Sequence, residues 1–343
     1  MSPRNRVTMS DIAEQSGVSL STVSLVLRDR PGVGADTRQR VLDTAKALGY
    51  LPKGDTQFSS SLTSIGLILK SVPDQAPQAN PFYSHVLAGI EAACRQWHLN
   101  LLFAIMPVDQ DSYPIEVPRL LREGNTVDAL LFVGAFVDDT VSQVVERRST
   151  PIVLVDAYAA SDLYDAVVTD NTKGAQSAVA HLIQRGHRHI GFVGHHLRAY
   201  PSIRDRSTGY TQALQQHGIP DRYLAECHIT DKDGVAEATT SLLEVNPQVT
   251  ALLGANDEVA FTAMEVARTL GRQIPDDVSI IGFDNIDPAK SVTPALTTMH
   301  VDKIGMGRLA VQLLINRVEY PDASPVTAVI RPYLVERKSV QSL

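Results

Sequence analysis

The hydrophobic pattern of the first fifty residues has helical spacing. It predicts three short helices, over residues 9–16, 20–27 and 35–48. Thr8 and Asp11 form the pattern of a capping box before the first helix, and Gly17 is suited to end that helix because glycine adopts the left-handed conformation at least cost. Ser19 is placed to cap the second helix. Two short helices joined by a glycine-containing turn indicate a helix-turn-helix.

From residue 65 the pattern changes to short apolar, β-branched runs that alternate with amphipathic segments. This alternation is typical of βαβ units and parallel sheets. The runs expected to form strands are 65–69, 99–105, 129–133, 152–155, 190–193, 251–253 and 278–283. The clearest helices between them are 82–97, 172–184 and 257–270. These strands are too many for one compact sheet, and 343 residues favour two or three domains.

Composition places the chain among soluble globular proteins, with 44% hydrophobic and 20% charged residues. The absence of a membrane-spanning run and of a secretory signal favours a cytoplasmic protein. Cys94 and Cys227 lack metal-site spacing and are expected to be buried free thiols. Although the net charge is -7, residues 1–53 carry eight basic and five acidic side chains. A basic head on an acidic body restricts phosphate attraction to one end of the chain.

The exposed face of the second helix favours DNA binding. Short hydroxyl side chains gather at its N-terminal end, namely Ser19, Ser21, Thr22 and Ser24. Such side chains reach phosphates and base edges when a helix N-terminus enters a major groove. The alternative is an ordinary three-helix bundle without a DNA role, which helix spacing alone does not exclude.

These helices resemble the headpiece of the LacI/GalR family of bacterial repressors. The resemblance is carried, in order and spacing, by segments 7–13, 17–24, 37–41 and 48–52. It implies that Leu20, Ser21 and Leu25 read bases; Leu25 offers only apolar contact, for example with a thymine methyl, and implies an unusual operator. The phosphate contacts that it implies are made by Thr8, Ser19, Thr22, Ser24 and Arg28.

The segment after the headpiece departs from the family. There the family has a hinge helix whose leucine wedges into the minor groove at the operator centre. Gly54, Asp55 and neighbouring serines are poor helix formers. Phe58 is the candidate wedge, and a flexible tether with a packed Phe58 is the alternative. The expected divisions are a headpiece over 1–52, a hinge or linker over 53–62, and an effector-binding and dimerisation domain over 63–343.

The resemblance covers the body as well, and implies two lobes like those of periplasmic sugar-binding proteins, crossed by three strands, with the ligand in the cleft. The fold class is therefore α/β: a helix-turn-helix headpiece followed by two Rossmann-like, parallel-sheet lobes. The expected N-lobe comprises residues 63–166 and 298–325. The expected C-lobe comprises residues 167–297 and 326–343.

Ligands of open α/β sheets bind beyond the carboxyl ends of the strands, where polar residues follow several predicted strands here. The expected effector-binding residues are Asp156, Arg206, Asn256, Asp257 and Asp284, with aromatic walls from Phe82 and Tyr83. A guanidinium that faces carboxylates and an amide suits bidentate bonding to vicinal hydroxyls or to the edge of a heterocycle. The alternative is that these residues are helix N-caps, above all Asn256 and Asp257.

Five histidines lie between residues 181 and 196, namely His181, His187, His189, His195 and His196. We expect structural or solvated roles for them and no metal, although His195 can still reach the cleft.

Other functional classes find less support. No P-loop, G-x-S-x-G elbow or dinucleotide fingerprint indicates an enzyme, and no cofactor is expected. A transport-type binding protein shares the body but has no use for a basic helical head. Because no heptad tail follows residue 336, we expect a homodimer. The sequence thus predicts a repressor that binds a pseudo-palindromic operator under the control of a small polar effector, a sugar or alternatively a nucleoside or purine, away from the membrane.

Overall fold

The computed structural model consists of two compact units, Met1–Ser60 and Ser61–Leu343. The residues that it describes are 7–27, 32–48, 50, 62–72, 80–122, 127–146 and 150–343. Arg28, Phe58 and nearly all of the expected linker lie outside the described residues. Within the described residues, the search for a helix with the length and apolar character needed to cross a membrane found none.

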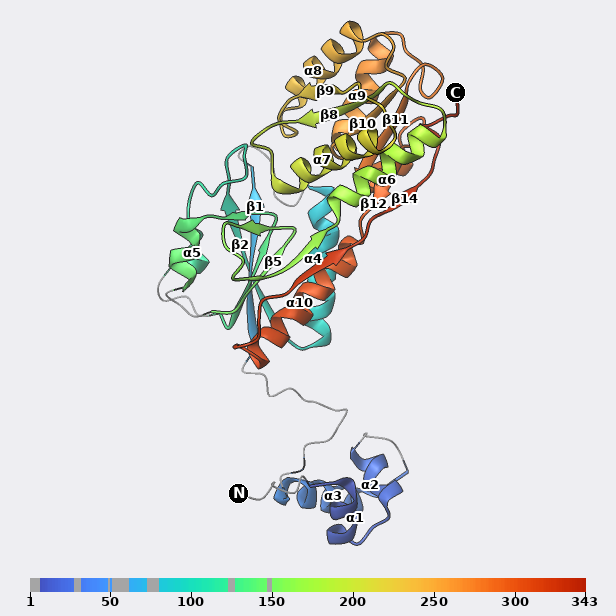
Figure 1. Ribbon diagram of the computed structural model, residues 1–343. Coiled ribbons are helices and arrows are strands. Elements are labelled where there is room, and N and C mark those ends of the chain that lie inside the picture. The colour runs from blue at the N-terminus through green and yellow to red at the C-terminus, as the bar shows by residue number, and fades with distance from the viewer. Residues whose placement is uncertain are drawn as a thin grey trace. The chain divides into compact units, whose positions relative to one another are not determined.

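The described part of the headpiece forms three helices (Figure 1). They are α1 (Met9–Ser16), α2 (Leu20–Leu27) and α3 (Ala35–Ala47). The predicted capping box is present at α1, because the backbone N–H of Thr8 donates to Asp11 Oδ2 at 2.6 Å and the backbone N–H of Asp11 donates to Thr8 Oγ1 at 3.4 Å. Gly17 ends α1 with a φ of 68°, in the left-handed region. These local interactions set the sharp turn between α1 and α2.

A small apolar core holds the three helices together. Its buried side chains are Ile12, Val23, Val26, Val41 and Ala45. The neighbouring Leu42 lies outside this core although it is apolar, and it is 43% exposed. Leu42 follows Val41 by one residue, which is about 100° around the helix, so only Val41 faces α1 and α2. The headpiece thus depends on few buried side chains.

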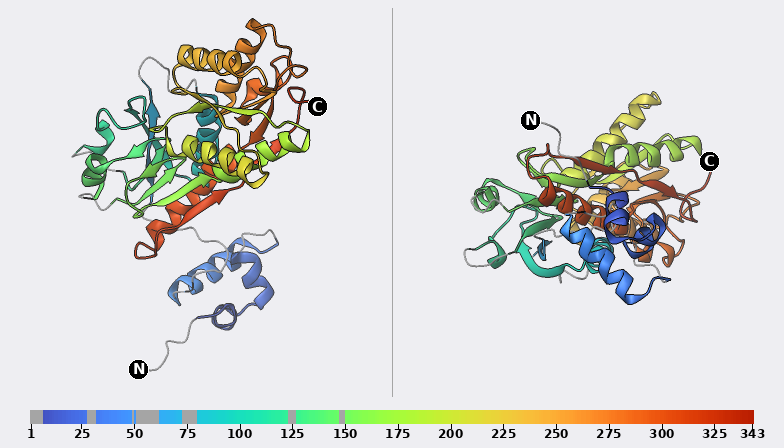
Figure 2. Two further views of the ribbon diagram at one scale, coloured as in Figure 1. Left: turned by 45° about the horizontal axis from the view of Figure 1, so that its top comes forward. Right: turned by 90° about the horizontal axis from the view of Figure 1, so that it is seen from below.

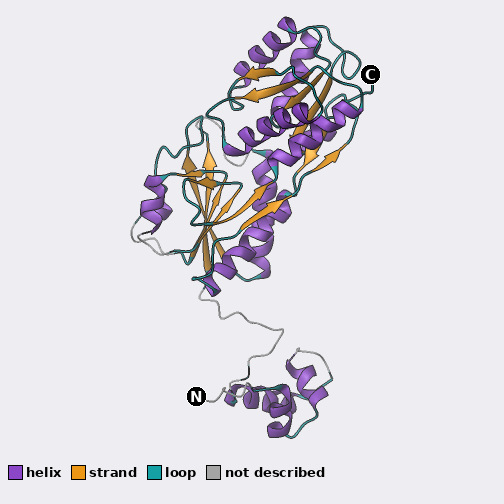
Figure 3. Cartoon of the chain, viewed as in Figure 1, coloured by secondary structure: helices purple, strands orange, loops and turns teal. Residues whose placement is uncertain are grey.

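The N-lobe is built on a six-stranded parallel sheet with the order β13-β7-β5-β3-β1-β2. Its strands are β1 (Ser64–Ser71), β2 (Asn100–Pro107), β3 (Ala129–Val133), β5 (Ile152–Val155), β7 (Asp165–Thr169) and β13 (Thr327–Ile330). The remaining elements are α4 (Pro81–Gln96), η2 (Arg119–Leu121), β4 (Phe136–Val137), α5 (Asp139–Glu146), β6 (Tyr158–Ala159) and α10 (Lys303–Glu319). Helices α4 and α10 lie side by side on the sheet, and α5 lies away from them (Figures 1 and 3).

The C-lobe repeats this plan with the strand order β14-β12-β11-β10-β8-β9. Its strands are β8 (Ile190–His195), β9 (Tyr223–Glu226), β10 (Ala251–Gly254), β11 (Ser279–Asp284), β12 (Thr297–His300) and β14 (Tyr333–Val335). Its helices are α6 (Asn171–Gln184), α7 (Pro201–Gln216), α8 (Lys232–Val245), α9 (Asp257–Thr269) and η3 (Asp287–Lys290). Helix α6 packs on α7, and α8 packs on α9 (Figure 2). Only β14 runs antiparallel to its neighbour.

The chain crosses between the lobes three times, after Thr169, after His300 and after Ile330. Each crossing comes later than the boundary expected from sequence. The reason is strand pairing: β7 pairs with β5, β12 with β11 and β13 with β7, so each strand completes its sheet before the chain leaves the lobe. Residues 326–330, expected in the C-lobe, therefore include an N-lobe strand.

Candidate DNA-binding helix and effector cleft

Helix α2 presents the expected base-reading positions on one exposed arc. At 100° per residue, Leu20, Ser21, Ser24 and Leu25 span about 140°. The side chains of Leu20 and Leu25 are 51% and 39% exposed, although both are apolar. Val23 and Val26 are buried on the opposite side. The two exposed leucines thus lie on the same face of α2 as the exposed Ser21.

The hydroxyls at the start of α2 form a local network. Ser19 caps the helix by accepting the backbone N–H of Thr22 at 3.1 Å. Its Oγ also hydrogen-bonds with Ser21 Oγ at 2.7 Å and with Thr22 Oγ1 at 2.8 Å. Ser21 is exposed, whereas Thr22 and Ser24 are half-buried. The structure therefore brings these predicted residues together at one helix end, and gives Ser19 a capping role besides any contact with phosphate.

Thr8 also has a structural role. Its hydroxyl donates to Asp11 Oδ2 at 2.8 Å while its oxygen accepts the Asp11 backbone N–H. A phosphate contact through this hydroxyl competes with the capping box, whereas the exposed backbone N–H groups of the first turn remain suited to an anion.

A cleft of about 600 Å³ lies between the two lobes of the body. All seven expected effector-binding residues line it, and among them Asp257 is fully buried. They are Phe82, Tyr83 and Asp156 from the N-lobe, and Arg206, Asn256, Asp257 and Asp284 from the C-lobe. The carboxyl ends of β5, β10 and β11 thus meet at the cleft, as the rule for parallel sheets requires.

Arg206 is the most constrained of these side chains and is only 4% exposed. Its Nε donates to Asn171 Oδ1 at 2.9 Å, its Nη1 to the backbone oxygen of Ala255 at 2.7 Å, and its Nη2 to Asp284 Oδ1 at 2.9 Å. The guanidinium carbon lies 3.8 Å from the centre of the Phe283 ring. These contacts fix the planar fork and use three of its five N–H groups.

Asp284 and Asp156 end their strands with unusual backbone geometry. Their φ angles are 104° and 46°, in the region where side chains are rarely found. Such strain often marks functional positions. Burial raises the pKa of Asp284, and the cations of Arg206 and Lys303 oppose that rise. Burial likewise raises the pKa of Asp156 to about 6, with Lys70 and Arg206 opposing it.

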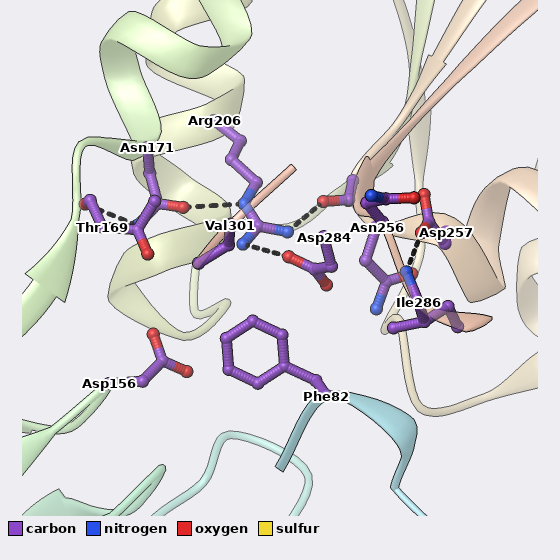
Figure 4. A network of polar contacts seen from close by, with 12 residues as sticks. Phe82, Asp156, Thr169, Asn171, Arg206, Asn256, Asp257, Asp284, Ile286 and Val301 are labelled. Carbon is purple, nitrogen blue, oxygen red and sulfur yellow. Dashed lines mark hydrogen bonds and ion pairs between the residues drawn. The ribbon is translucent and has the colours of Figure 1, made fainter. Parts of the chain in front are cut away.

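On the N-lobe side, Asp156 is held by two tyrosines. Tyr83 donates its hydroxyl to Asp156 Oδ2 at 2.9 Å, and Tyr200 donates to the backbone oxygen of Asp156 at 3.0 Å. Because Tyr200 begins α7 of the C-lobe, its bond crosses the cleft. Figure 4 shows Asp156 and Phe82 facing the Arg206–Asp284 pair from the other lobe.

Lys70 and Tyr200 line the cleft but were missed from the sequence. Lys70 Nζ lies 4.2 Å from the centre of the Tyr200 ring, and burial lowers the pKa of this lysine to about 8. Lys70 lies near the end of β1, where the strand-end rule already pointed, whereas no local signal marks Tyr200. Asn171, which orients Arg206, was also missed because it follows β7, a strand that the sequence pattern did not reveal.

Asn256 and Asp257 have structural roles that the sequence left open. Asn256 caps α9 by accepting the backbone N–H of Val259 at 2.8 Å. Asp257 is fully buried, and its two oxygens accept from the backbone N–H of Ile286 at 2.8 Å and from Thr298 Oγ1 at 2.5 Å. Asp257 thus anchors the loop after β11, next to Asp284.

The histidines separate in the structure. His187 is fully buried and bonded to Thr250 Oγ1 and to the backbone oxygen of Gln341. His195 hydrogen-bonds with Ser207 Oγ at 2.9 Å and is not among the cleft-lining residues. His196, by contrast, does line the cleft.

Comparisons with known proteins agree with this architecture. The profile of the lacI family of bacterial regulatory proteins matches residues 8–53, and that of the periplasmic binding protein-like domain matches residues 179–340. The chain is 30% identical to catabolite control protein A of Priestia megaterium over 312 residues, which are 90% of this chain and 91% of that protein. It is 29% identical to the HTH-type transcriptional repressor PurR of Mannheimia succiniciproducens, over 98% of this chain and 99% of that protein.

A solved structure of similar fold is a LacI family transcriptional regulator from Enterococcus faecium with bound ribose. It aligns with a TM-score of 0.70 and 27% identity, covering 82% of this chain and all of that chain. Headpiece, two-lobed body and near full-length similarity to transcriptional regulators lead to one assignment. The chain belongs to the lacI family of bacterial regulatory proteins and is a DNA-binding transcriptional regulator.

Proposed function

We propose that the protein is a cytoplasmic, homodimeric repressor that binds a pseudo-palindromic operator through α2. Binding of a sugar in the cleft determines whether the repressor releases or retains this operator. Two headpieces of a dimer place their recognition helices in major grooves about one helical turn apart. The exposed arc of Leu20, Ser21 and Leu25 supports base contact by α2. Apolar contact from the two leucines favours an operator with thymine methyl groups at these positions.

The observation that carries the effector proposal is the fixed Arg206 fork. Its orientation is set by Asn171 and Asp284, and the carboxylate of Asp156 faces it from the other lobe (Figure 4). Planar donors opposite carboxylate acceptors match vicinal hydroxyls, and the Phe82 ring offers a surface for the apolar face of a sugar. Ribose bound in the structure of the Enterococcus faecium relative supports the same ligand class.

We assign contact with the effector to Arg206, Asp284, Asp156 and Phe82. Tyr83 orients Asp156 through its hydroxyl, and Asp257 holds the loop beside Asp284. The sugar then touches both lobes at once. A ligand shifts a conformational equilibrium only by its differential affinity for the two states, and contacts to both lobes supply that difference. Lobe closure transmitted to the spacing of the headpieces changes operator affinity.

The proposed function is binding without catalysis. Three carboxyl groups of the cleft have partners within the protein: Asp284 accepts from Arg206, Asp156 accepts from Tyr83, and Asp257 accepts from the backbone of Ile286, an arrangement suited to holding a ligand.

Effector identity is tested by thermal unfolding of the full chain with a panel of pentoses, hexoses and nucleosides. A ligand that binds the native state raises the unfolding temperature by mass action. We expect a sugar to raise it and calorimetry to show one sugar per chain. A nucleoside that binds while all sugars fail replaces the sugar in this proposal.

Operator recognition is tested by fluorescence anisotropy on promoter fragments next to the gene. Leu20→Ala and Ser21→Ala are each expected to weaken specific binding by up to about 1 kcal/mol, less than the roughly 1–3 kcal/mol that a bidentate base contact contributes. Leu163→Ala, which truncates an exposed leucine of the body, is the matched control. Operator affinity that is insensitive to both headpiece changes contradicts base reading by α2.

A further inference from the structure

Three potential metal ligands meet at the rim of the cleft. They are Asp111, His196 and His228, each of which offers one ligand atom, and these atoms all lie within 4.8 Å of one another. Asp111 belongs to the segment after β2 in the N-lobe, whereas His196 follows β8 and His228 follows β9 in the C-lobe. His196 and His228 also line the effector cleft. The group therefore spans the two lobes.

The fold sets each of these side chains in place. Strands β8 and β9 are parallel neighbours, so the residues that follow them lie at the same edge of the C-lobe sheet. The centres of the two imidazole rings lie 3.8 Å apart, and the ring planes are tilted by 41° to each other. Opposite them, Asp109 Oδ1 accepts the backbone N–H groups of Asp111 and Tyr113, at 3.0 and 2.9 Å, and fixes the turn that carries Asp111.

The carboxylate of Asp111 lacks a proton donor. Its Oδ1 is buried and has no hydrogen-bond partner among the described residues. The nearest ring nitrogen, His228 Nδ1, lies 3.8 Å away, which is beyond hydrogen-bond range. A buried acceptor without a donor is costly, and a cation at this position removes that cost. The side chains of His228 and Asp111 are 31% and 22% exposed, so an ion can reach them from solvent.

We propose that Asp111, His196 and His228 bind Zn²⁺ or a similar divalent transition metal across the mouth of the cleft. Two imidazoles and one carboxylate form a donor set that such ions prefer, with a fourth position open to water or to a hydroxyl of a ligand in the cleft. From the sequence we expected no metal, because we considered only histidines that are close together along the chain. His228 and Asp111 are distant from His196 in sequence.

Metal binding requires a small contraction of the site. Bonds of about 2.1 Å in a tetrahedral site place ligand atoms about 3.4 Å apart, closer than the 4.8 Å span observed. The backbone N–H of Arg198 donates to His196 Nδ1 at 3.2 Å, and this hydrogen bond must also break. If Nδ1 binds the metal, its lone pair is used by the metal; if Nε2 binds the metal, Nδ1 carries the ring proton and cannot accept. Since Asp111 lies on the opposite lobe, the contraction draws the lobes together. The metal therefore stabilises the closed arrangement, whether or not the effector is a sugar.

The test measures metal binding to the full chain after treatment with a chelator and dialysis. We expect calorimetry, in competition with a chromophoric chelator, to show one Zn²⁺ per chain. His228→Ala, His196→Ala and Asp111→Asn are each expected to weaken binding at least about tenfold, since even the outer-shell partners of a metal site contribute that much. Zn²⁺ should raise the unfolding temperature of the wild type more than that of the variants.

His189→Ala is the matched control. His189 lies 3.9 Å from Asp221, nearly the same separation as His228 and Asp111, but among the described residues no third ligand joins that pair. This variant should keep full metal affinity. Co²⁺ gives an independent readout, because a site with two imidazoles and a carboxylate produces a visible absorption band that should disappear in correctly folded His228→Ala. Unchanged binding in the three site variants, or an equal loss in His189→Ala, overturns the proposal.

Discussion

The headpiece and the effector cleft are stabilised by different kinds of interaction. The contact surface of α2 is exposed and is held by local interactions, from the caps at Thr8 and Ser19 to a core of five small or medium side chains. The cleft is buried, and its charged groups bond to partners far away in sequence, such as Arg206 with Asp284. Local caps tolerate change at modest cost, whereas a buried charge that loses its partner is strongly destabilised. Four predictions test this contrast, in order of decreasing effect.

Arg206→Ala should destabilise the protein and abolish effector binding. It removes the cation that is hydrogen-bonded to the buried Asp284, so we expect a loss of about 3–5 kcal/mol in the free energy of unfolding and no measurable effector binding. Chemical denaturation and calorimetry measure the two effects. Arg272→Ala is the control, because this arginine binds the backbone oxygens of Val249 and Leu243 away from the cleft. Arg206→Lys, which keeps the charge without the fork, separates folding from recognition. Full effector affinity in either Arg206 variant places the pocket elsewhere.

Ile12→Ala should unfold the headpiece alone. Truncation of a fully buried isoleucine costs about 2–5 kcal/mol, and so small a core has little stability to lose. Anisotropy should show loss of operator binding, while calorimetry shows unchanged effector affinity. Leu42→Ala, on the exposed side of α3, should change stability by less than about 0.5 kcal/mol. A parallel loss of effector affinity in Ile12→Ala shows that the two units do not fold independently.

Effector affinity should depend on pH through Asp156. Its pKa is raised to about 6, so the folded state favours the protonated carboxyl; this contribution to stability is complete below about pH 4 and is lost as pH rises through 6. Hydroxyls of a sugar donate to the carboxylate form. Calorimetry should therefore show affinity falling up to about tenfold from pH 7 to pH 5. Asp156→Asn should flatten the profile, and a profile unaffected by this change assigns the dependence to another group.

Thr8→Ala should have the smallest effect. Removal of the capping hydroxyl costs about 1 kcal/mol, and Asp11 keeps its bond to the backbone N–H of residue 8. The unfolding temperature of the headpiece and its affinity for the operator should both decrease slightly. A large loss of operator affinity with unchanged stability reveals a direct phosphate contact by Thr8 that outweighs its capping role.

Some strands of the body were predictable from the sequence and others were not. The continuous apolar runs at 129–133 and 152–155 coincide with β3 and β5, because central parallel strands are buried on both faces. Strand β13 has a short apolar run at 328–330, but it lies at a sheet edge, alternates between exposed and half-buried positions, and was not predicted. Missing it, with β7 and β12, displaced the expected lobe crossings.

The residues of the cleft were also predictable only in part. The strand-end rule located Asp156 and Asp284, and placed Arg206 near them. It did not show which of these side chains already have partners within the protein: Asp257 also follows a strand, and its two oxygens accept hydrogen bonds from Ile286 and Thr298.

The sequence by itself determined the helices of the headpiece, the alternating α/β plan and the positions at strand ends, because these depend on caps, turns and the period of apolar residues along the chain. Only the tertiary structure decided which of those ends face one another. The partners of Arg206, the bond from Tyr200 across the cleft and the meeting of Asp111 with His196 and His228 join residues distant in sequence, and no local pattern encodes such pairing.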